Sequence, residues 1–460
     1  MPADRQSRLI VAANRLPVSW DPDSEEWKPS AGGLVSALSP VLRSRGGVWV
    51  GWDGSADGKA ESFQAEGIDL QSVPLTADEV EDHYDGFSNT TIWPLYHDAI
   101  RIPEFHRHWW RPHQEVSRRF ADAIADVSEP SDVIWVHDYQ LQLVPAMVRA
   151  LVPGARIGFF LHIPFPPPEI FERLPWRRGV LQGLLGADHI GFQTRRAALN
   201  FAASAREFAD ARGPADALQH EGRTIRAETV PISIATDKYA EAATRPDLIQ
   251  KAAELRNDLG DPEIIILGVD RLDYTKGIDL RLRVMEAVLD AHPELHHRVS
   301  LVQVAVPSRE DVDEYQEIRR QVEELVGRVN GRFAKSDWNP VHYVYRSLPF
   351  EDLIAHYLAA DVMLVTPLRD GMNLVAKEYV ATRLDNSGVL VLSEFAGASE
   401  QLTQAVVVNP YDLDAMAEAL IHAVNMGSGE QLHRMQRLRR AVARWDVGRW
   451  ARHNLGRIEE

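Results

Sequence analysis

Short apolar runs alternate with amphipathic stretches along most of the chain. Four early runs, at residues 8–13, 48–52, 134–137 and 157–162, are almost wholly apolar, and each either ends in a polar residue or is followed by one. This pattern predicts buried strands, followed by an apolar helix after Gly33 and an amphipathic helix after Asp138. Strands that alternate with helices predict an α/β fold with doubly wound sheets, in which ligands bind outside the carboxyl ends of the strands.

The same series starts again near residue 263. Residues 263–289 give another strand, loop and helix, and further strand–loop units follow as far as VVVNPYDL. We therefore predict a first domain over residues 1–236 and a second over residues 237–445, with a cleft between them. The tail, residues 446–460, is expected to be a helix that packs back on the first domain. Residues 229–237 are predicted as a strand leaving the first domain.

One stretch, DVMLVTPLRDGMNLVAKE at residues 361–378, combines a strand, a glycine turn and a helix start. Backbone N–H groups at such a helix start have no partner within the helix, so they suit a phosphate or a sugar hydroxyl. Asp370 and Glu378 bracket the turn, and two carboxylates favour a ligand that carries hydroxyls as well as phosphate. The alternative is a purely structural turn.

Charged and polar residues also follow other predicted strands. Arg271 and Lys276 lie five residues apart in one loop, and this pair suits a diphosphate, although a solvated basic loop is the alternative. Arg309 follows the next strand and is another candidate for binding an anion. His137 with Asp138, and then His162, end two successive strands and would face one crevice, whereas a lone histidine there would more often be a satisfied loop residue.

Glycines and prolines mark further loops. Gly32 and Gly33 open a helix and would let a ligand approach the backbone, unless they only provide a turn. Residues 84–93 (YDGFSNTTIW) are predicted as an aromatic-rich loop and turn. The prolines at 164, 166, 167 and 168 predict a rigid extended segment without regular structure. Asp311 and Asp313 could be tested as a metal site, but their charged surroundings favour a solvated helix face.

Composition narrows the function further. The chain has 460 residues, enough for about two or three domains, and 50 Lys and Arg against 67 Asp and Glu give a net charge of −17. This charge argues against nucleic-acid or anionic-membrane binding as the main activity. Cysteine is absent, which excludes thiol catalysis, disulfides and zinc–thiolate sites and fits a reducing compartment. Without a signal peptide or an apolar run of about 18 residues, we expect a cytoplasmic protein.

Six strings together resemble the retaining glycosyltransferases that make trehalose 6-phosphate. They are GGLVSAL, FSNTTIWPLYHD, HDYQLQLVP, IGFFLHIPFPPPEIF, GVDRLDYTKGID and TPLRDGMNLVAKEYVA. The likeness extends from Asn14 to Pro410, and the last three strings are highly specific together. It implies the GT-B architecture, two Rossmann-like domains facing across a cleft. The C-terminal domain would hold a nucleotide sugar, UDP-glucose or GDP-glucose, and the N-terminal domain glucose 6-phosphate.

The resemblance also assigns residues. Arg15 and Arg309 would bind the acceptor phosphate and Asp138 the acceptor hydroxyls, with Tyr84 and Trp93 completing that site. Arg271 and Lys276 match the diphosphate pair, Leu348 a backbone contact to the base, and His162 a residue near the donor glucose. The remaining donor contacts match Gly32, Gly33, Asp370, Gly371, Met372, Asn373, Leu374, Val375, Ala376, Lys377 and Glu378.

The expected reaction gives α,α-trehalose 6-phosphate and a nucleoside diphosphate. Arg271, Lys276 and the helix start at Asn373 would stabilise the negative charge of the leaving group, so neither a metal nor a cofactor is expected. His162 and Asp370 are the other catalytic candidates, Asp370 orienting donor hydroxyls and not acting as a nucleophile. We expect a homo-oligomer. Two alternatives stay open, a related (pseudo)glycosyltransferase with another acceptor and a non-catalytic sugar-phosphate sensor.

Overall fold

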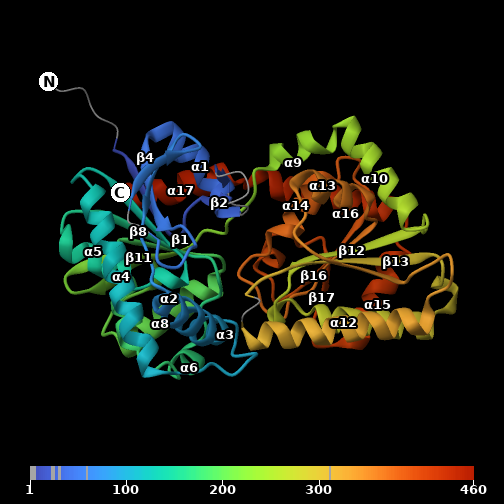
Figure 1. Ribbon diagram of the computed structural model, residues 1–460, viewed down its shortest axis with the longest axis horizontal. Coiled ribbons are helices and arrows are strands. Elements are labelled where there is room, and N and C mark those ends of the chain that lie inside the picture. Colours follow the sequence, from blue (N-terminus) through green and yellow to red (C-terminus); the bar gives the residue numbers. More distant parts are fainter. Residues whose placement is uncertain (1–6, 22–25, 30–32, 59–60, 310–311) are drawn as a thin grey trace. The chain divides into compact units, whose positions relative to one another are not determined.

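A computed structural model describes residues 7–21, 26–29, 33–58, 61–309 and 312–460 (Figure 1). The chain forms two compact units, one made of residues 1–232 together with 447–460 and the other of residues 233–446. Each unit contains its own sheet and core. In the part of the chain that the structure describes, no helix is both long and apolar enough to cross a bilayer.

The first unit is built on a nine-stranded sheet with the order β10-β11-β9-β8-β7-β1-β4-β6-β5. The inner strands from β11 to β6 run parallel, and only the edge pairs β10–β11 and β5–β6 are antiparallel. The strands are β1 (Leu9–Arg15), β4 (Gly47–Trp52), β5 (Ser62–Ala65), β6 (Ile68–Ser72), β7 (Val133–His137), β8 (Arg156–Leu161), β9 (His189–Phe192), β10 (Leu218–His220) and β11 (Arg223–Thr229). A separate hairpin pairs β2 (Val18–Asp21) with β3 (Glu26–Pro29).

Helices connect and cover these strands. Every residue of β4 and β7 is buried, as expected for parallel strands that carry helices on both faces of the sheet. The longer helices of this unit are α1 (Gly33–Arg45), α4 (Arg107–Val127), α5 (Val144–Leu151), α7 (Arg177–Leu184), α8 (Arg195–Phe208) and α17 (Val447–Glu459).

The second unit has a six-stranded, fully parallel sheet with the order β14-β13-β12-β15-β16-β17. In chain order this reads 3-2-1-4-5-6, the Rossmann arrangement, and its switch point lies between β12 and β15. The strands are β12 (Ile264–Arg271), β13 (Val299–Val306), β14 (Val341–Tyr345), β15 (Val362–Val365), β16 (Val389–Ser393) and β17 (Val406–Val408). The helices are α9 (Thr236–Ala243), α10 (Pro246–Asp258), α11 (Ile278–Ala291), α12 (Asp313–Phe333), α13 (Phe350–Ala359), α14 (Leu374–Thr382), α15 (Leu413–Val424) and α16 (Ser428–Arg444).

The first unit repeats this order, because β6, β4, β1, β7, β8 and β9 also read 3-2-1-4-5-6. Its switch point lies between β1 and β7, which end at Arg15 and His137. The doubly wound class predicted from the sequence is therefore confirmed in both units. Ligands are expected outside the carboxyl ends of these two strand pairs.

Three local predictions were wrong. Residues 84–93 do not form a loop: a π-helical segment, Val80–Ile92, continues into α3 (Trp93–Tyr96). A wide turn is closed by the backbone bond from the Trp93 N–H to the Ser88 carbonyl, five residues back, and the Ser88 hydroxyl donates to the His83 carbonyl at 2.7 Å. The segment is helical and largely buried, although its polar composition is typical of a loop.

The strand predicted at residues 229–237 is also absent. β11 ends at Thr229, and α9 begins at Thr236. Pro231 has no N–H to donate to a ladder, and the Ile232 N–H bonds to the Gln193 side chain at 2.9 Å, not to a neighbouring strand. The proline-rich segment also differs from the expectation, since Pro168 begins the short helix α6 (Pro168–Phe171), where a first-turn proline is tolerated.

Helix α17 belongs to the first unit although it follows the second in sequence. Trp450 is fully buried, and its ring centroid lies 5.0 Å from those of Trp135 and Phe160. Gly158 makes room for this helix, because a Cβ there would lie 2.2 Å from the side chain of Ile458. The helix thus completes the core over β7 and β8.

Replacing Trp450 by alanine should lower the free energy of unfolding of the first unit by about 3–5 kcal/mol, because a large buried ring is lost and leaves a cavity. Urea unfolding followed by circular dichroism measures this change. Arg452→Ala, on the exposed side of the same helix, is the control. Equal midpoints for the two variants would contradict the packing described here.

Candidate active site

The loops after β12 and β15 meet at the switch point of the second unit. Lys276 lies in a single 3₁₀ turn, Tyr274–Lys276, directly before Gly277. Gly277 has φ +64°, and a Cβ there would lie 2.7 Å from the Thr366 carbonyl oxygen. Only glycine combines this backbone conformation with so close an approach. The sequence therefore brings the β12 loop against the β15 loop.

Two of the predicted site residues form an ion pair there. The Nζ atom of Lys276 lies 2.5 Å from Oδ2 of Asp370, and both side chains are largely buried. The carboxylate of Asp370 also accepts hydrogen bonds from the Met372 N–H at 3.3 Å and from the Asn373 amide at 3.2 Å. Asp370 is thus held in one orientation at the carboxyl end of the sheet.

Asp273, a residue that the sequence reasoning missed, lies at the centre of the same loop and is fully buried. Its Oδ1 accepts from the Thr275 N–H at 2.9 Å and the Thr275 hydroxyl at 2.8 Å, and its Oδ2 accepts from the Tyr315 hydroxyl at 3.0 Å. Burial alone would raise the pKa of Asp273, but the charges of Arg271, Arg309 and Lys276 and the Thr275 N–H lower it to about 2.

Arg309 lies on the other side of this carboxylate. Its Nη1 is 3.8 Å from Oδ2 of Asp273, it donates a hydrogen bond to the Tyr315 hydroxyl, and its side chain is only 5% exposed. The structure therefore gathers three of the cations that the sequence singled out, Arg271, Lys276 and Arg309, around one buried acid. The motif DYTKG contains Asp273, but the prediction followed only its lysine, Lys276.

The helix predicted to start at Asn373 is present, and α14 begins one residue later, at Leu374. Asn373 has φ +69° and precedes α14 without a capping bond from its own side chain, while Gly371 and Met372 before it are buried. Leu374 and Val375 are half-buried, and Ala376 is fully buried. The first backbone N–H groups of α14 are therefore placed close to Asp370, where an oxyanion could be bound.

Farther along α14, the two charged residues differ in their surroundings. Lys377 is buried and donates to Oε1 of Gln401 at 2.6 Å, and burial lowers its pKa to about 7. Glu378 accepts hydrogen bonds from the hydroxyls of Tyr357, at 2.8 Å, and Tyr239, and burial raises its pKa. Neither tyrosine was found from the sequence, because nothing in a single sequence pairs residues so far apart.

The structure shows the places of two further predicted donor contacts, Leu348 and Gly33, but, among the residues that it describes, no partner for them that bears on a ligand. Leu348 is half-buried in the loop between β14 and α13. Gly33 is the first residue of α1, as a helix-opening glycine should be. Gly32 and Asp311 lie outside the described residues, and Asp313 begins α12.

At the switch point of the first unit, Arg15 extends from the end of β1 over aromatic rings. Its guanidinium carbon lies 3.9 Å from the Trp52 ring centroid and 5.6 Å from that of Tyr84. The two rings meet edge to face at 5.6 Å. This stacking restricts the arginine, which the sequence placed beside Tyr84 only through the resemblance.

The end of β7 brings the polar strand ends together as predicted. Nδ1 of His137 lies 3.2 Å from Nε2 of His162, and the Asp138 carboxylate accepts from the His162 N–H at 3.3 Å. Burial lowers the pKa of His162 to about 3, so its imidazole is neutral at ordinary pH. Trp93 packs against Tyr139, next to Asp138, at a ring separation of 5.6 Å.

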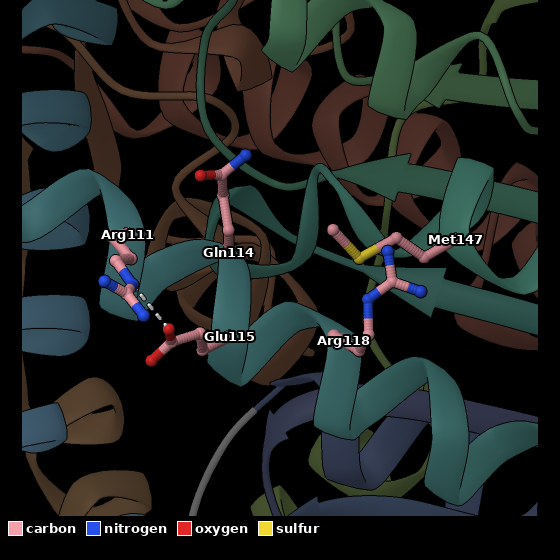
Figure 2. Close-up of a pocket in the computed structure, with 5 residues that line it drawn as sticks. All are labelled: Arg111, Gln114, Glu115, Arg118 and Met147. Atoms are coloured by element: carbon pink, nitrogen blue, oxygen red, sulfur yellow. Dashed lines mark hydrogen bonds and ion pairs between the residues drawn. The ribbon is translucent and has the colours of Figure 1, made fainter.

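A separate hollow of about 360 Å³ lies between α4 and α5 (Figure 2). Arg111 pairs with Glu115 at 2.8 Å along one of its sides, and Arg118 and Met147 lie together on another. None of the predicted site residues lines it. It is therefore distinct from the two strand-end sites.

A family model described as Glycosyltransferase family 20 matches residues 7–460. The chain belongs to this family. A curated relative, the trehalose-6-phosphate synthase of Mycolicibacterium smegmatis, is 48% identical over 461 residues, which is 98% of this chain and 92% of the relative.

Two solved structures extend the comparison. An alpha,alpha-trehalose-phosphate synthase (UDP-forming) from Burkholderia xenovorans, in complex with glucose-6-phosphate, has a TM-score of 0.92, 35% identity, and coverage of 99% of this chain and 100% of that one. A structure described as trehalose-6-phosphate from E. coli bound with UDP-2-fluoro glucose has a TM-score of 0.91, 36% identity, and 99% coverage of both chains. The likeness to trehalose-6-phosphate synthases and the GT-B class are confirmed, and the chain is a transferase.

For this glycosyltransferase family 20 member, the low pKa of Asp273 predicts acid lability. A carboxylate whose pKa is lower in the folded than in the unfolded chain adds stability above about pH 4, and that stability is lost as the pH falls toward 2. Asp273→Asn lacks this contribution, so its free energy of unfolding should be lower than that of the wild type. This stability deficit should shrink by roughly 1 kcal/mol as the pH falls from 5 to 3.

Urea unfolding at the two pH values measures the deficit. Asp337→Asn, at an exposed carboxylate, controls for the loss of a surface charge. If the deficit of Asp273→Asn were the same at pH 5 and pH 3, Asp273 would not be the ionised centre described here.

Proposed function

We propose that the chain transfers glucose from UDP-glucose to glucose 6-phosphate, with retention of configuration, to give α,α-trehalose 6-phosphate and UDP. The observation that carries the proposal is the group of Arg271, Lys276 and Arg309 around Asp273 at a Rossmann switch point. Sugar phosphates need fixed cations in a protein whose net charge is −17. The choice of UDP is supported by the relative named as UDP-forming.

The second unit is proposed to bind the donor. Arg271 and Lys276 would bind the diphosphate, and the N–H groups at the start of α14 would bind it or the glucose. Asp370, oriented by Met372 and Asn373, would accept from glucose hydroxyls. Glu378 would hold the ribose hydroxyls, and Gly33 and Leu348 would contribute backbone contacts.

The acceptor is proposed to bind through Arg15, Tyr84, Trp93, Asp138 and Arg309. Arg15 and Arg309 would neutralise the phosphate of glucose 6-phosphate, since guanidinium groups match phosphate geometry. Asp138 would accept from acceptor hydroxyls, because its carboxylate is fixed by the N–H groups of Tyr139 and His162. A neutral His162 would hydrogen-bond the donor glucose without adding charge.

The reaction breaks the bond from glucose C1 to the diphosphate and forms a bond from C1 to the anomeric oxygen of the acceptor. The electron pair leaves with the diphosphate, whose negative charge Arg271 and Lys276 stabilise. The acceptor proton passes to the departing phosphate oxygen on the same face. Asp370 then orients the donor and need not attack C1, and we propose that neither metal nor cofactor takes part.

We propose a cytoplasmic enzyme, because a chain without cysteine suits a reducing compartment, and a homo-oligomer. We also keep residues 1–236 and 237–445 as the proposed acceptor and donor domains, with residues 446–460 serving the first.

Release of nucleoside diphosphate tests the proposal. UDP-glucose, GDP-glucose and ADP-glucose are each supplied with and without glucose 6-phosphate, in the presence of EDTA. Release from UDP-glucose that requires glucose 6-phosphate and survives EDTA is expected. Failure with every donor would contradict the proposed reaction and favour another acceptor or a sensor.

Arg309→Ala should raise the KM for glucose 6-phosphate roughly 10- to 100-fold and leave the donor KM nearly unchanged, because one charge-assisted contact to the acceptor phosphate is lost. Steady-state kinetics with each substrate varied in turn measures both constants. Arg328→Ala, at a half-exposed arginine of α12 paired with Glu286, is the matched control. Equal effects on the two KM values would refute the assignment of Arg309.

A further inference from the structure

We propose that Asp273 is a positioning residue that holds the donor and acceptor cations around one shared counter-charge. The inference rests on the proposed function and extends it, because it makes the diphosphate site and the acceptor-phosphate site of the second unit depend on the same buried carboxylate. Tyr315 is assigned a second positioning role, linking this carboxylate to Arg309.

The two oxygens of Asp273 have different partners. Oδ1 accepts from the N–H and hydroxyl of Thr275 and so fixes the loop that carries Lys276. Oδ2 faces Tyr315 and Arg309 instead. One oxygen therefore shapes the donor loop, and the other faces the residues of the acceptor side.

Tyr315 lies between the carboxylate and the arginine. Its hydroxyl donates to Asp273 at 3.0 Å and accepts from Nη1 of Arg309. Burial raises the pKa of Tyr315, so the hydroxyl keeps its proton and can donate. Tyr274, from the donor loop, packs edge to face on the Tyr315 ring at 5.8 Å, which ties α12 to that loop.

Without the counter-charge this arrangement would be unfavourable. Arg271, Lys276 and Arg309 all act on the same carboxylate, and both Lys276 and Arg309 are mostly buried. Like charges in such surroundings repel each other, and water can screen them only weakly. With Asp273 neutral, Lys276 would keep its pair with Asp370, but Arg271 and Arg309 would lose this counter-charge, and the cations should lose their alignment toward the two phosphate groups.

Asp273→Asn removes the charge but keeps an amide oxygen that can still accept from the Thr275 N–H, since asparagine replaces aspartate well at such positions. We expect this variant to raise the KM for UDP-glucose and the KM for glucose 6-phosphate, each roughly tenfold or more. Tyr315→Phe should raise only the KM for glucose 6-phosphate, by about fivefold to tenfold, because Arg309 loses its hydroxyl partner while Asp273 keeps its charge and its two Thr275 donors.

Two controls match these changes. Asp361→Asn removes a carboxylate paired with Arg256 at 2.9 Å, next to the amino end of β15, and Tyr96→Phe removes a buried hydroxyl bonded to Gln142 at 2.6 Å in the first unit. Both should leave the two KM values unchanged even if they lower the melting temperature. A purely structural role of Asp273 would give the same result as these controls.

Three results would overturn the inference. They are unchanged KM values in Asp273→Asn, a rise in only one of them, and an equal rise of both in Tyr315→Phe. If Asp273→Asn did not fold, Tyr315→Phe alone would decide through its selective effect on the acceptor KM.

Calorimetry separates this inference from the proposed reaction. If the wild type turned over no donor, the proposed reaction would fail. Binding of UDP and of glucose 6-phosphate would then still test the inference. Asp273→Asn should weaken both ligands and Tyr315→Phe only glucose 6-phosphate, and any other pattern would refute the shared counter-charge.

Discussion

The site in the second unit depends on the compensation of buried charge. A carboxylate that loses water must gain cations and hydrogen-bond donors, and Asp273 has both, with Arg309 and Tyr315 on one side and Thr275 on the other. In β12, just before this loop, Asp270 pairs with the fully buried Arg281 at 2.7 Å. These pairs hold the carboxyl end of β12 in place. They also make it polar, whereas the rest of the sheet is largely apolar. Arg271 and Lys276, which we propose bind the diphosphate, lie at this end of the strand.

In the first unit, the strand ends carry neutral histidines. His137 and His162 lie 3.2 Å apart, and burial keeps their imidazoles uncharged because it lowers the pKa of each. Arg15 is the cation there, and it stacks on Trp52, where an aromatic face supports it without neutralising its charge. Neutral imidazoles, the Asp138 carboxylate and one arginine suit a sugar that carries a single phosphate. Trp450, in α17, packs against the ring of Trp135 in β7, the strand that ends at His137.

Much of this could be predicted from the sequence because it follows from local pattern. Val362–Val365 was identified as a strand by its apolar run, and Arg271, Lys276 and Asp370 by their places at strand ends. Asp273 was missed because a buried acid cannot be told from a turn residue without its distant partner Tyr315. The π-helical segment at 80–92 was missed because several of its polar side chains bond to distant residues, Asn89 to Tyr139 and Thr91 to Glu104, whereas composition alone suggested a loop.

The central claim is that glucose passes from a nucleotide sugar to glucose 6-phosphate on one face of the donor. Nuclear magnetic resonance of the product made from UDP-glucose labelled with ¹³C at C1 tests it most directly. The account predicts that the label appears in a disaccharide phosphate as an α-linked anomeric carbon bonded through oxygen to a second α anomeric carbon. A β-configured labelled carbon, or label recovered only as free glucose, would contradict it.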